Sequence, residues 1–388
     1  MTAPPAGGAL PASPVPVTLT PLLGFPEVRV GDDLAHLMVG ALQDNGIQLV
    51  DGDILVLSSK VVSKAMGLRA PSGEQADVVL SQTVRIVVER MTPSGVTRIV
   101  ESAAGPVMTA AGVDASNTAD EATVLLLPDD PDAVAAQIRA GVQAGWAELT
   151  GTHPSAGVIL SDTAGRPWRN GQTDFALGAA GVRVVDDLRG STDTDGRILS
   201  VTERCVADEI AAAADLVKGK ATGIPAAHLR GLGQYVLAGE PDAGPDDDSG
   251  GTSDRARDLV RTGPQDWFGY GMAEAVRAAL GVEPGSPTAS EVGIAFIFSE
   301  DVAIRARRAL RVALLTCPGA VGEVEGDTLA LEAPDDFTLG VAATRAEVAL
   351  HGEGLTTTLT RSPARAPTSP VATDGLLTVP PRVLIVFH

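Results

Sequence analysis

Aromatic residues and cysteine are both scarce in this chain of 388 residues. Phe, Trp and Tyr together make up 3% of the sequence, whereas 44% of all residues are hydrophobic. The core must therefore consist of closely packed aliphatic side chains. The two cysteines, Cys205 and Cys317, lie far apart and match no metal-ligand or redox spacing. We interpret them as reduced, structural thiols.

Long apolar runs are also missing. No run approaches the ~20 apolar residues that a membrane-spanning helix needs. Residues 1–16 lack the cationic start and apolar centre of a signal peptide, and their Pro, Ala and Gly content predicts a disordered leader. We therefore expect a cytoplasmic protein without a membrane partner.

Positive charge is in short supply, since the formal net charge is −20. Such a chain repels nucleic acid phosphates over most of its surface, so no nucleic acid partner is expected. An anionic ligand must instead meet a local concentration of Arg, Lys, metal or backbone N–H groups.

Several common catalytic motifs are absent. The sequence has no G-x-x-x-x-G-K-[ST] P-loop, because GKAT at Gly219 lacks the upstream glycine. The segments at Gly231 and Gly269 both lack the third glycine of a dinucleotide fingerprint. Neither H-E-x-x-H nor G-x-S-x-G occurs, which leaves zinc peptidase and serine hydrolase chemistry without support.

The pattern that remains alternates strands and helices, and the length predicts two or three domains. Helices are expected at 31–46, 77–90 and 129–146, and strands at 17–24, 54–59 and 157–161. Residues 201–220 are expected to form a strand followed by a helix that ends near Gly219. We expect strands on both sides of Ala104 and Gly105, a polar turn over 162–174, and close backbone packing in the Gly- and Ala-rich stretch 176–185.

An acidic stretch rich in Gly, Pro and Ser over residues 239–256 predicts a flexible insertion. Residues 17–281 then form the main domain, and residues 282–388 form a linker and a small C-terminal α+β module of unknown function. In that module we expect a strand at Ile294–Phe298, a helix at Asp301–Leu315 and a final strand over 382–387.

Polar side chains at expected strand ends are the candidates for chemistry. Asp162 and Thr163 follow the apolar run GVILS and can offer hard oxygen ligands to a divalent cation. Asp114 and Asn117 follow another apolar run, whose small residues let backbone approach a ligand. A turn cap explains Asp162, and an Asx turn explains Asp114, equally well.

Basic residues accompany these candidates. The segment SSKVVSK, from Ser58 to Lys64, follows a buried strand, and cations with hydroxyl groups suit phosphate oxygens. Arg166 and Arg169 lie a few residues from Asp162, and Lys218 and Lys220 lie at a helix end. A solvated surface loop and charges on the rim of a site remain the alternatives.

Taken together, these segments resemble the coenzyme F420-0:L-glutamate ligase family over about residues 17–281. The resemblance rests on several motifs in the family's order: GFPEVRVGDDLA, DGDILVLSSKVVSKA, AAGVDASN, SDTAGRPWRNGQTDFALGAAG and VTERCVADEIAAAADLVKGKATGIP. It implies an intertwined α+β fold with mixed sheets and no P-loop, and a homodimer.

The resemblance also implies the reaction. L-glutamate is joined to coenzyme F420-0 through an acyl phosphate, with GTP as co-substrate and with Mn²⁺ or Mg²⁺ and K⁺ as cofactors, and GDP and phosphate are released. Further γ-glutamyl additions stay open. The family's metal ligands correspond to Asp114, Asp162 and Thr163, and the residues expected to act on the reacting groups are Asp162, Lys64 and Arg166. The nucleotide would contact Phe25, Pro26, Glu27, Val28, Ser58, Ser59, Lys64, Asn117, Lys218, Gly219, Ala221, Thr222, Gly223 and Ile224.

The sequence departs from the family in three places. Lys220 stands where other members carry a glutamate metal ligand, so we do not assign it as a ligand. Glu101 to Gly105 lacks the basic residue that often precedes this glycine. Residues 289–388 lack the patterns of the flavin-binding, nitroreductase-like domain that some members carry.

Two other classes of function stay open from the residues. A metal-dependent phosphohydrolase would use the same carboxylates and cations, and a non-catalytic protein could bind the deazaflavin alone. In the latter case the arginines of the C-terminal helix, Arg305, Arg307, Arg308 and Arg311, would form either a docking face or a solvated helix surface.

Overall fold

The computed structural model describes residues 15–116, 118, 122–237, 254–361 and 380–388. Its contacts divide the chain into two units, one of residues 1–83 and 101–262 and the other of residues 84–100 and 263–388. The expected leader and acidic insertion lie almost entirely outside the described residues. The domain boundary after residue 281 stays a prediction, although residues 263–281 group with the C-terminal unit by their contacts.

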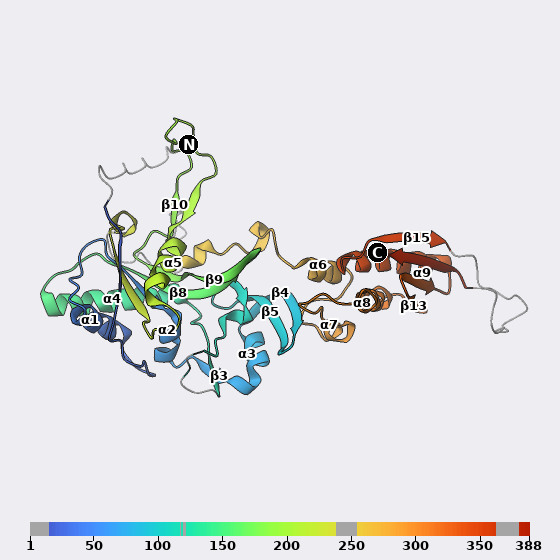
Figure 1. Cartoon of the computed structure of the whole chain (residues 1–388), viewed down its shortest axis with the longest axis horizontal. Helices are drawn as coiled ribbons and strands as arrows, with labels where there is room; N and C mark the ends of the chain where they lie inside the picture. Colours follow the sequence, from blue (N-terminus) through green and yellow to red (C-terminus); the bar gives the residue numbers. More distant parts are fainter. Residues whose placement is uncertain (1–14, 117, 119–121, 238–253, 362–379) are drawn as a thin grey trace, which may run out of the picture. The chain divides into compact units, whose positions relative to one another are not determined.

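A five-stranded mixed sheet forms the centre of the first unit (Figure 1). Its strands follow the order β1 (Thr18–Pro21), β12 (Ala226–Arg230), β2 (Ile54–Ser58), β8 (Gly157–Arg166) and β9 (Arg169–Ala180). β2 and β8 run parallel, and the other neighbours run antiparallel. The carboxyl ends of β2 and β8 therefore lie at one edge of the sheet.

Helices cover both faces of this sheet, which explains why its central strands are apolar at successive positions. On one face, Leu55 and Leu57 pack with α1 (Leu34–Asp44) and α4 (Pro131–Thr150). On the other face, Ile54 and Val56 pack with α5 (Val206–Lys218). Alternate residues of one strand thus serve two separate aliphatic cores.

The three long helices of this unit confirm the predictions made from helical spacing and acidic starts. Asp33 caps α1 by accepting from the backbone N–H of His36. Asp130 caps α4 in the same way through Ala133, with Pro131 in the first turn. The first turn of α5 carries two carboxylates instead of a side-chain cap.

Close backbone packing in the stretch 176–185 is confirmed at Gly178. A Cβ at this position would lie 2.3 Å from the carbonyl oxygen of Pro131. Any larger side chain would push β9 away from the start of α4.

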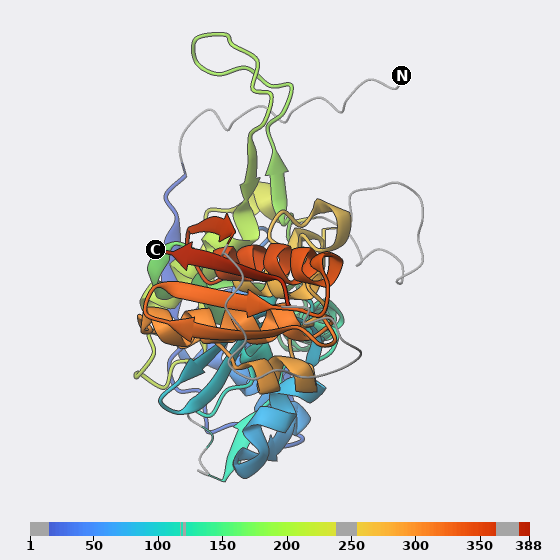
Figure 2. The same cartoon turned by 90° about the vertical axis from the view of Figure 1, so that its right-hand side faces the viewer.

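The smaller elements of the first unit surround this core. They are α2 (Ser59–Met66), α3 (Gln75–Ser81), β6 (Val107–Thr109), the pair β3 (Arg69–Pro71) and β7 (Thr123–Leu125), and the pair β10 (Val185–Asp187) and β11 (Glu203–Cys205). The β10–β11 hairpin extends outward as an arm (Figure 2). Short 3-10 turns occupy Ser72–Glu74, Ala110–Gly112, Gly233–Tyr235 and Ala256–Leu259.

The second unit is an α+β module. Its antiparallel sheet has the order β13 (Val321–Glu325), β14 (Thr328–Glu332), β16 (Arg382–Phe387) and β15 (Thr357–Arg361). Apolar side chains of β14 and β16 pack with α8 (Val302–Leu314) and α9 (Asp336–Gly352) in one core. The unit also contains α6 (Met272–Ala279), α7 (Pro287–Val292), a 3-10 turn at Gly263–Gln265 and most of the hairpin β4 (Thr83–Thr92) and β5 (Gly95–Ser102). The α+β class is confirmed.

Three local predictions were wrong. Residues 83–90 form part of β4 rather than a helix, because the β-branched run suits a strand. Residues 294–298 form only an isolated bridge at Phe296. The polar residues 162–174 extend β8 and β9 into a long hairpin instead of forming a turn. The segment SSKVVSK, for which a surface loop was the alternative, is mostly the helix α2.

The arginines of α8 form no common docking face. Arg308 is 3% exposed and donates to Glu300 and Glu353 inside the second unit. Arg305 donates to the carbonyl oxygen of Glu353.

Across the part of the chain that the structure describes, no helix combines the length and apolarity needed to span a membrane.

Candidate functional site

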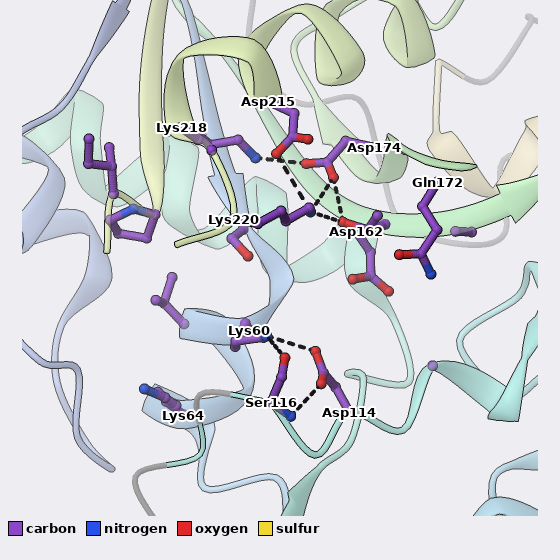
Figure 3. A pocket seen from close by; sticks show the side chains of 18 of the residues that line it. Lys60, Lys64, Asp114, Ser116, Asp162, Gln172, Asp174, Asp215, Lys218 and Lys220 are labelled. Carbon is purple, nitrogen blue, oxygen red and sulfur yellow. Dashed lines mark hydrogen bonds and ion pairs between the residues drawn. The ribbon is translucent and has the colours of Figure 1, made fainter. Parts of the chain in front are cut away.

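A pocket of about 790 Å³ opens where the parallel strands β2 and β8 end (Figure 3). Ser58 and Ser161 pair across these two strands, and the chain then continues into α2 on one side and to Asp162 on the other. The end of α5 and residues 219–225 line a further wall. Strand ends thus bring segments that are distant in sequence to one cavity.

Lysine is concentrated at this pocket. The chain contains only four lysines, Lys60, Lys64, Lys218 and Lys220. All four line this one cavity. In a protein with a net charge of −20, this placement creates the local positive charge that an anionic ligand requires.

Asp174 is the centre of the hydrogen-bond network on one side of the pocket. Its Oδ2 accepts from Ser161 Oγ and Lys218 Nζ, both at 2.9 Å, and its Oδ1 accepts from Thr163 Oγ1 at 2.5 Å and Lys220 Nζ at 3.0 Å. Burial alone would raise the pKa of Asp174, but the ammonium group of Lys218 and these donors lower it below its usual value. Asp174 is therefore ionised and fully paired.

Asp162 has a contrasting environment in the same pocket. Its Oδ1 accepts from Ser59 Oγ at 3.2 Å, and within the described residues it has no ion-pair partner. Burial raises the pKa of the Asp162 carboxyl to about 6, and the negative charges of Asp114 and Asp174 act in the same direction. A carboxylate of this kind is stabilised by a cation beside it.

Asp114 lies on the opposite wall and lines the same cavity as Asp162 (Figure 3). Lys60 Nζ lies 2.8 Å from its Oδ2, and the backbone N–H of Ser116 donates to its Oδ1. Burial raises the pKa of Asp114, but the hydrogen bonds from Lys60 and Ser116 outweigh this effect and lower it. The two carboxylates expected to hold a metal are therefore brought together.

Most of the residues expected at the nucleotide also line the pocket. These are Pro26, Glu27, Val28, Ser58, Lys64, Lys218, Gly219, Ala221, Gly223 and Ile224. Ser59 and Thr222 support the wall instead, because Ser59 donates to Asp162 and Thr222 donates to the carbonyl oxygen of Lys218. Their roles in binding stay predictions.

Two expected residues, Phe25 and Arg166, do not line the cavity. Phe25 packs against the aliphatic core between the sheet, α1 and α4. Arg166 is exposed at the end of β8, next to the tight turn of the hairpin, and does not line the pocket. Asn117 lies outside the described residues.

Several pocket residues were missed by the sequence analysis, above all Asp174. Its position opposite Thr163 in the β8–β9 hairpin places it beside the predicted metal ligands. A hairpin assignment for residues 157–180 alone would not have revealed it, because the register shifts between Leu160 and Ser161 and between Gly165 and Arg166. Asp215 was also missed. Lys60 belongs to the segment SSKVVSK, which was expected near phosphate oxygens, but it was not among the residues assigned to the nucleotide.

The donor set fits a divalent cation that also contacts a bound substrate. In the described part of the chain, no three Asp, Glu, His or Cys side chains converge closely enough to hold a metal by themselves. Asp114 and Asp162 nevertheless line one cavity with the backbone and hydroxyl oxygens of its walls. Mg²⁺ is commonly bound by one or two carboxylates together with water and phosphate oxygens.

The chain was then compared with known proteins. The model of the family described as F420-0:gamma-glutamyl ligase matches residues 23–231. The chain belongs to this family. Every residue of the pocket falls within the matched segment, whereas residues 232–388 lie beyond it.

Archaeal members of the F420-0:gamma-glutamyl ligase family show the extent of the similarity. A protein of Archaeoglobus fulgidus named coenzyme F420:L-glutamate ligase is 39% identical over 241 residues, which cover 58% of this chain and 90% of the relative. Proteins of the same name from Methanothermobacter thermautotrophicus and Haloarcula marismortui are 38% and 36% identical, over 55% and 63% of this chain and 89% and 95% of the relatives.

Proposed function

We propose that this chain joins L-glutamate to coenzyme F420-0 through an amide bond, with hydrolysis of GTP to GDP and phosphate. The observation that carries this proposal is the pocket itself, which lies within the family match and combines carboxylates for a divalent cation with all four lysines of the chain. The names of the relatives support the choice of glutamate and the deazaflavin coenzyme.

The proposed reaction has two steps. A carboxylate oxygen of F420-0 attacks the γ-phosphorus of GTP, and the bond from that phosphorus to the bridging oxygen breaks to release GDP. The glutamate amine then attacks the acyl carbon, loses a proton, and displaces phosphate. Activation is needed because a free carboxylate has no adequate leaving group.

The side chains of the pocket would act mainly by positioning and charge neutralisation, which dominate phosphoryl transfer. Lys60, Lys64 and Lys218 line the pocket and would neutralise phosphate oxygens of the nucleotide. Asp114 and Asp162 would hold Mn²⁺ or Mg²⁺ beside Thr163, and the ion would neutralise charge that develops on the phosphates. Ser59 orients Asp162 through its hydrogen bond.

The direct test combines product mass with one substitution. The full chain is incubated with F420-0, L-glutamate, GTP, Mn²⁺ and K⁺, and the coenzyme is analysed by mass spectrometry for added glutamyl units. We expect Asp162→Asn to reduce kcat/KM for ligation by about 100-fold or more, because the cation loses a charged ligand.

Asp44→Asn is the matched control, since Asp44 is an exposed aspartate at the end of α1. It should leave the rate unchanged. Full activity in a folded Asp162→Asn protein would refute the assignment of Asp162. GTP hydrolysis without a glutamylated product would instead favour a phosphohydrolase.

The homodimer is part of the same proposal, and light scattering on a sizing column tests it.

A further inference from the structure

The carboxylates of the pocket fall into two groups with different partners. Asp174 and Asp215 lie around the amino group of Lys220, whereas Asp162 faces Asp114 across the cavity (Figure 3). The first group already contains its own positive charge. The second group contains a carboxylate without an ion-pair partner among the described residues.

Lys220 reaches the first group from just beyond the end of α5. Its Nζ donates to Thr163 Oγ1 and to Asp174 Oδ1, the latter at 3.0 Å, and it lies 3.6 Å from Asp215 Oδ1. Two carboxylates and a hydroxyl oxygen thus surround one ammonium group. Oxygen ligands of this kind also surround a bound Mg²⁺ or Mn²⁺.

Asp174 has no remaining capacity for a metal in this arrangement. An ionised carboxylate offers about four lone-pair sites. Asp174 accepts from four donors, which are Ser161, Thr163, Lys218 and Lys220. A cation could bind there only after displacing one of these donors, and the nearby lysine charges would oppose its approach.

The backbone after α5 makes this placement possible. The helix ends at Lys218, and Gly219 then adopts φ 64° and ψ 167°, a conformation that is essentially restricted to glycine. The sharp change of direction lets both Lys218 and Lys220 reach Asp174 from the same end of the helix.

We propose that the ammonium group of Lys220 serves as a fixed cation on the Asp174 side of the pocket, so that each chain binds one divalent ion, at Asp114 and Asp162, instead of two. This inference rests on the proposed function, because it assigns the charges that would surround the nucleotide. In phosphoryl-transfer sites that bind two metal ions, both ions neutralise charge on the substrate. Here a side chain supplies part of that charge permanently.

The test counts bound metal. Equilibrium dialysis of the full chain against Mn²⁺, with a saturating non-hydrolysable GTP analogue, should give one Mn²⁺ per chain. The variant Lys220→Glu should give two, because it removes the ammonium group and adds a carboxylate near Asp215 and Thr163. Arg307→Glu, which makes the same change of charge at an exposed position of α8, should still give one.

A spectroscopic measurement keeps the test independent of any variant. Because the chain has four lysines, selective ¹⁵N labelling of lysine gives four side-chain signals at most. With paramagnetic Mn²⁺ bound at Asp114 and Asp162, the lysine signals should broaden. With diamagnetic Mg²⁺ in the same site, the signal of the hydrogen-bonded Lys220 ammonium group should remain. Loss of that signal with Mg²⁺ would show that the metal displaces Lys220 and would overturn the proposal.

The two proposals fail in different ways. Two Mn²⁺ per wild-type chain, or one per folded Lys220→Glu chain, would overturn the role of Lys220 even if ligation is observed. One Mn²⁺ per wild-type chain and two per variant, without a glutamylated product, would overturn the proposed function and leave the charge assignment of Lys220 in place.

Discussion

Asp53 provides a pH-dependent test of how the central sheet is held together. It precedes β2 and is fully buried, and Arg230 donates to both of its oxygens at 2.8 and 2.7 Å. The backbone N–H of Val50 donates to Oδ2 at 3.0 Å, and His228 Nε2 lies 2.9 Å from the same atom. Asp53 thereby links β2 to β12, which carries both basic partners.

The size of this contribution follows from its pKa. Burial raises the pKa of Asp53, but the hydrogen bonds from Arg230 and His228 outweigh burial and lower it from 3.8 to about 2. A difference of this size between the unfolded and folded chain corresponds to about 2 kcal/mol. Because the folded pKa is the lower one, this stability is fully present above about pH 5 and is lost as the pH falls toward 2.

The measurement compares wild type with Asp53→Asn in urea unfolding between pH 6 and pH 3. Trp146 is buried in the same unit, so replacing Trp168 and Trp267 by Phe leaves a fluorescence signal from that unit alone. We expect the variant to be less stable by about 2 kcal/mol at pH 6, with the difference shrinking at lower pH. Asp44→Asn, at the exposed end of α1, is the control. A difference that stays constant from pH 6 to pH 3 would refute the reasoning.

Two glycine substitutions give further predictions. Gly178→Ala should lower the free energy of unfolding by about 1–3 kcal/mol in the same urea titration, because its Cβ would overlap the Pro131 carbonyl. Gly165→Ala is the control and should have little effect, because a Cβ at that position meets nothing within 4 Å. Gly219→Ala should raise KM for GTP, because Gly219 directs the two neighbouring lysines into the pocket, and should also lower the free energy of unfolding by about 1–3 kcal/mol, because alanine is strained in this conformation. An unchanged KM in the Gly219→Ala protein would contradict that role.

The sequence predicted best those elements whose signals are local. The helices α1 and α4 have side-chain caps, and α4 also has proline at its start, so both could be located without knowledge of the fold. The buried strands β2 and β8 are short apolar runs followed by polar residues. These features also located Asp162 and the lysines of α2 and α5.

The errors arose where tertiary contacts decide the conformation. α2 has eight residues and no side-chain cap, so its helical form depends on packing of Val62 and Ala65 into the core. The polar residues 162–174 extend a hairpin whose register only the fold reveals. Asp174 was missed for this reason, since its importance comes from Thr163 and Lys220, which approach it from other segments.

The distribution of lysine has a practical consequence for handling this protein. Amine-reactive cross-linkers, dyes and sensor-chip chemistry act on lysine side chains, and here every such side chain lines one cavity. Random amine coupling would therefore modify either the chain's α-amino group or the pocket itself. The same property makes protection from an amine-reactive dye a simple measure of ligand occupancy, without any engineered label.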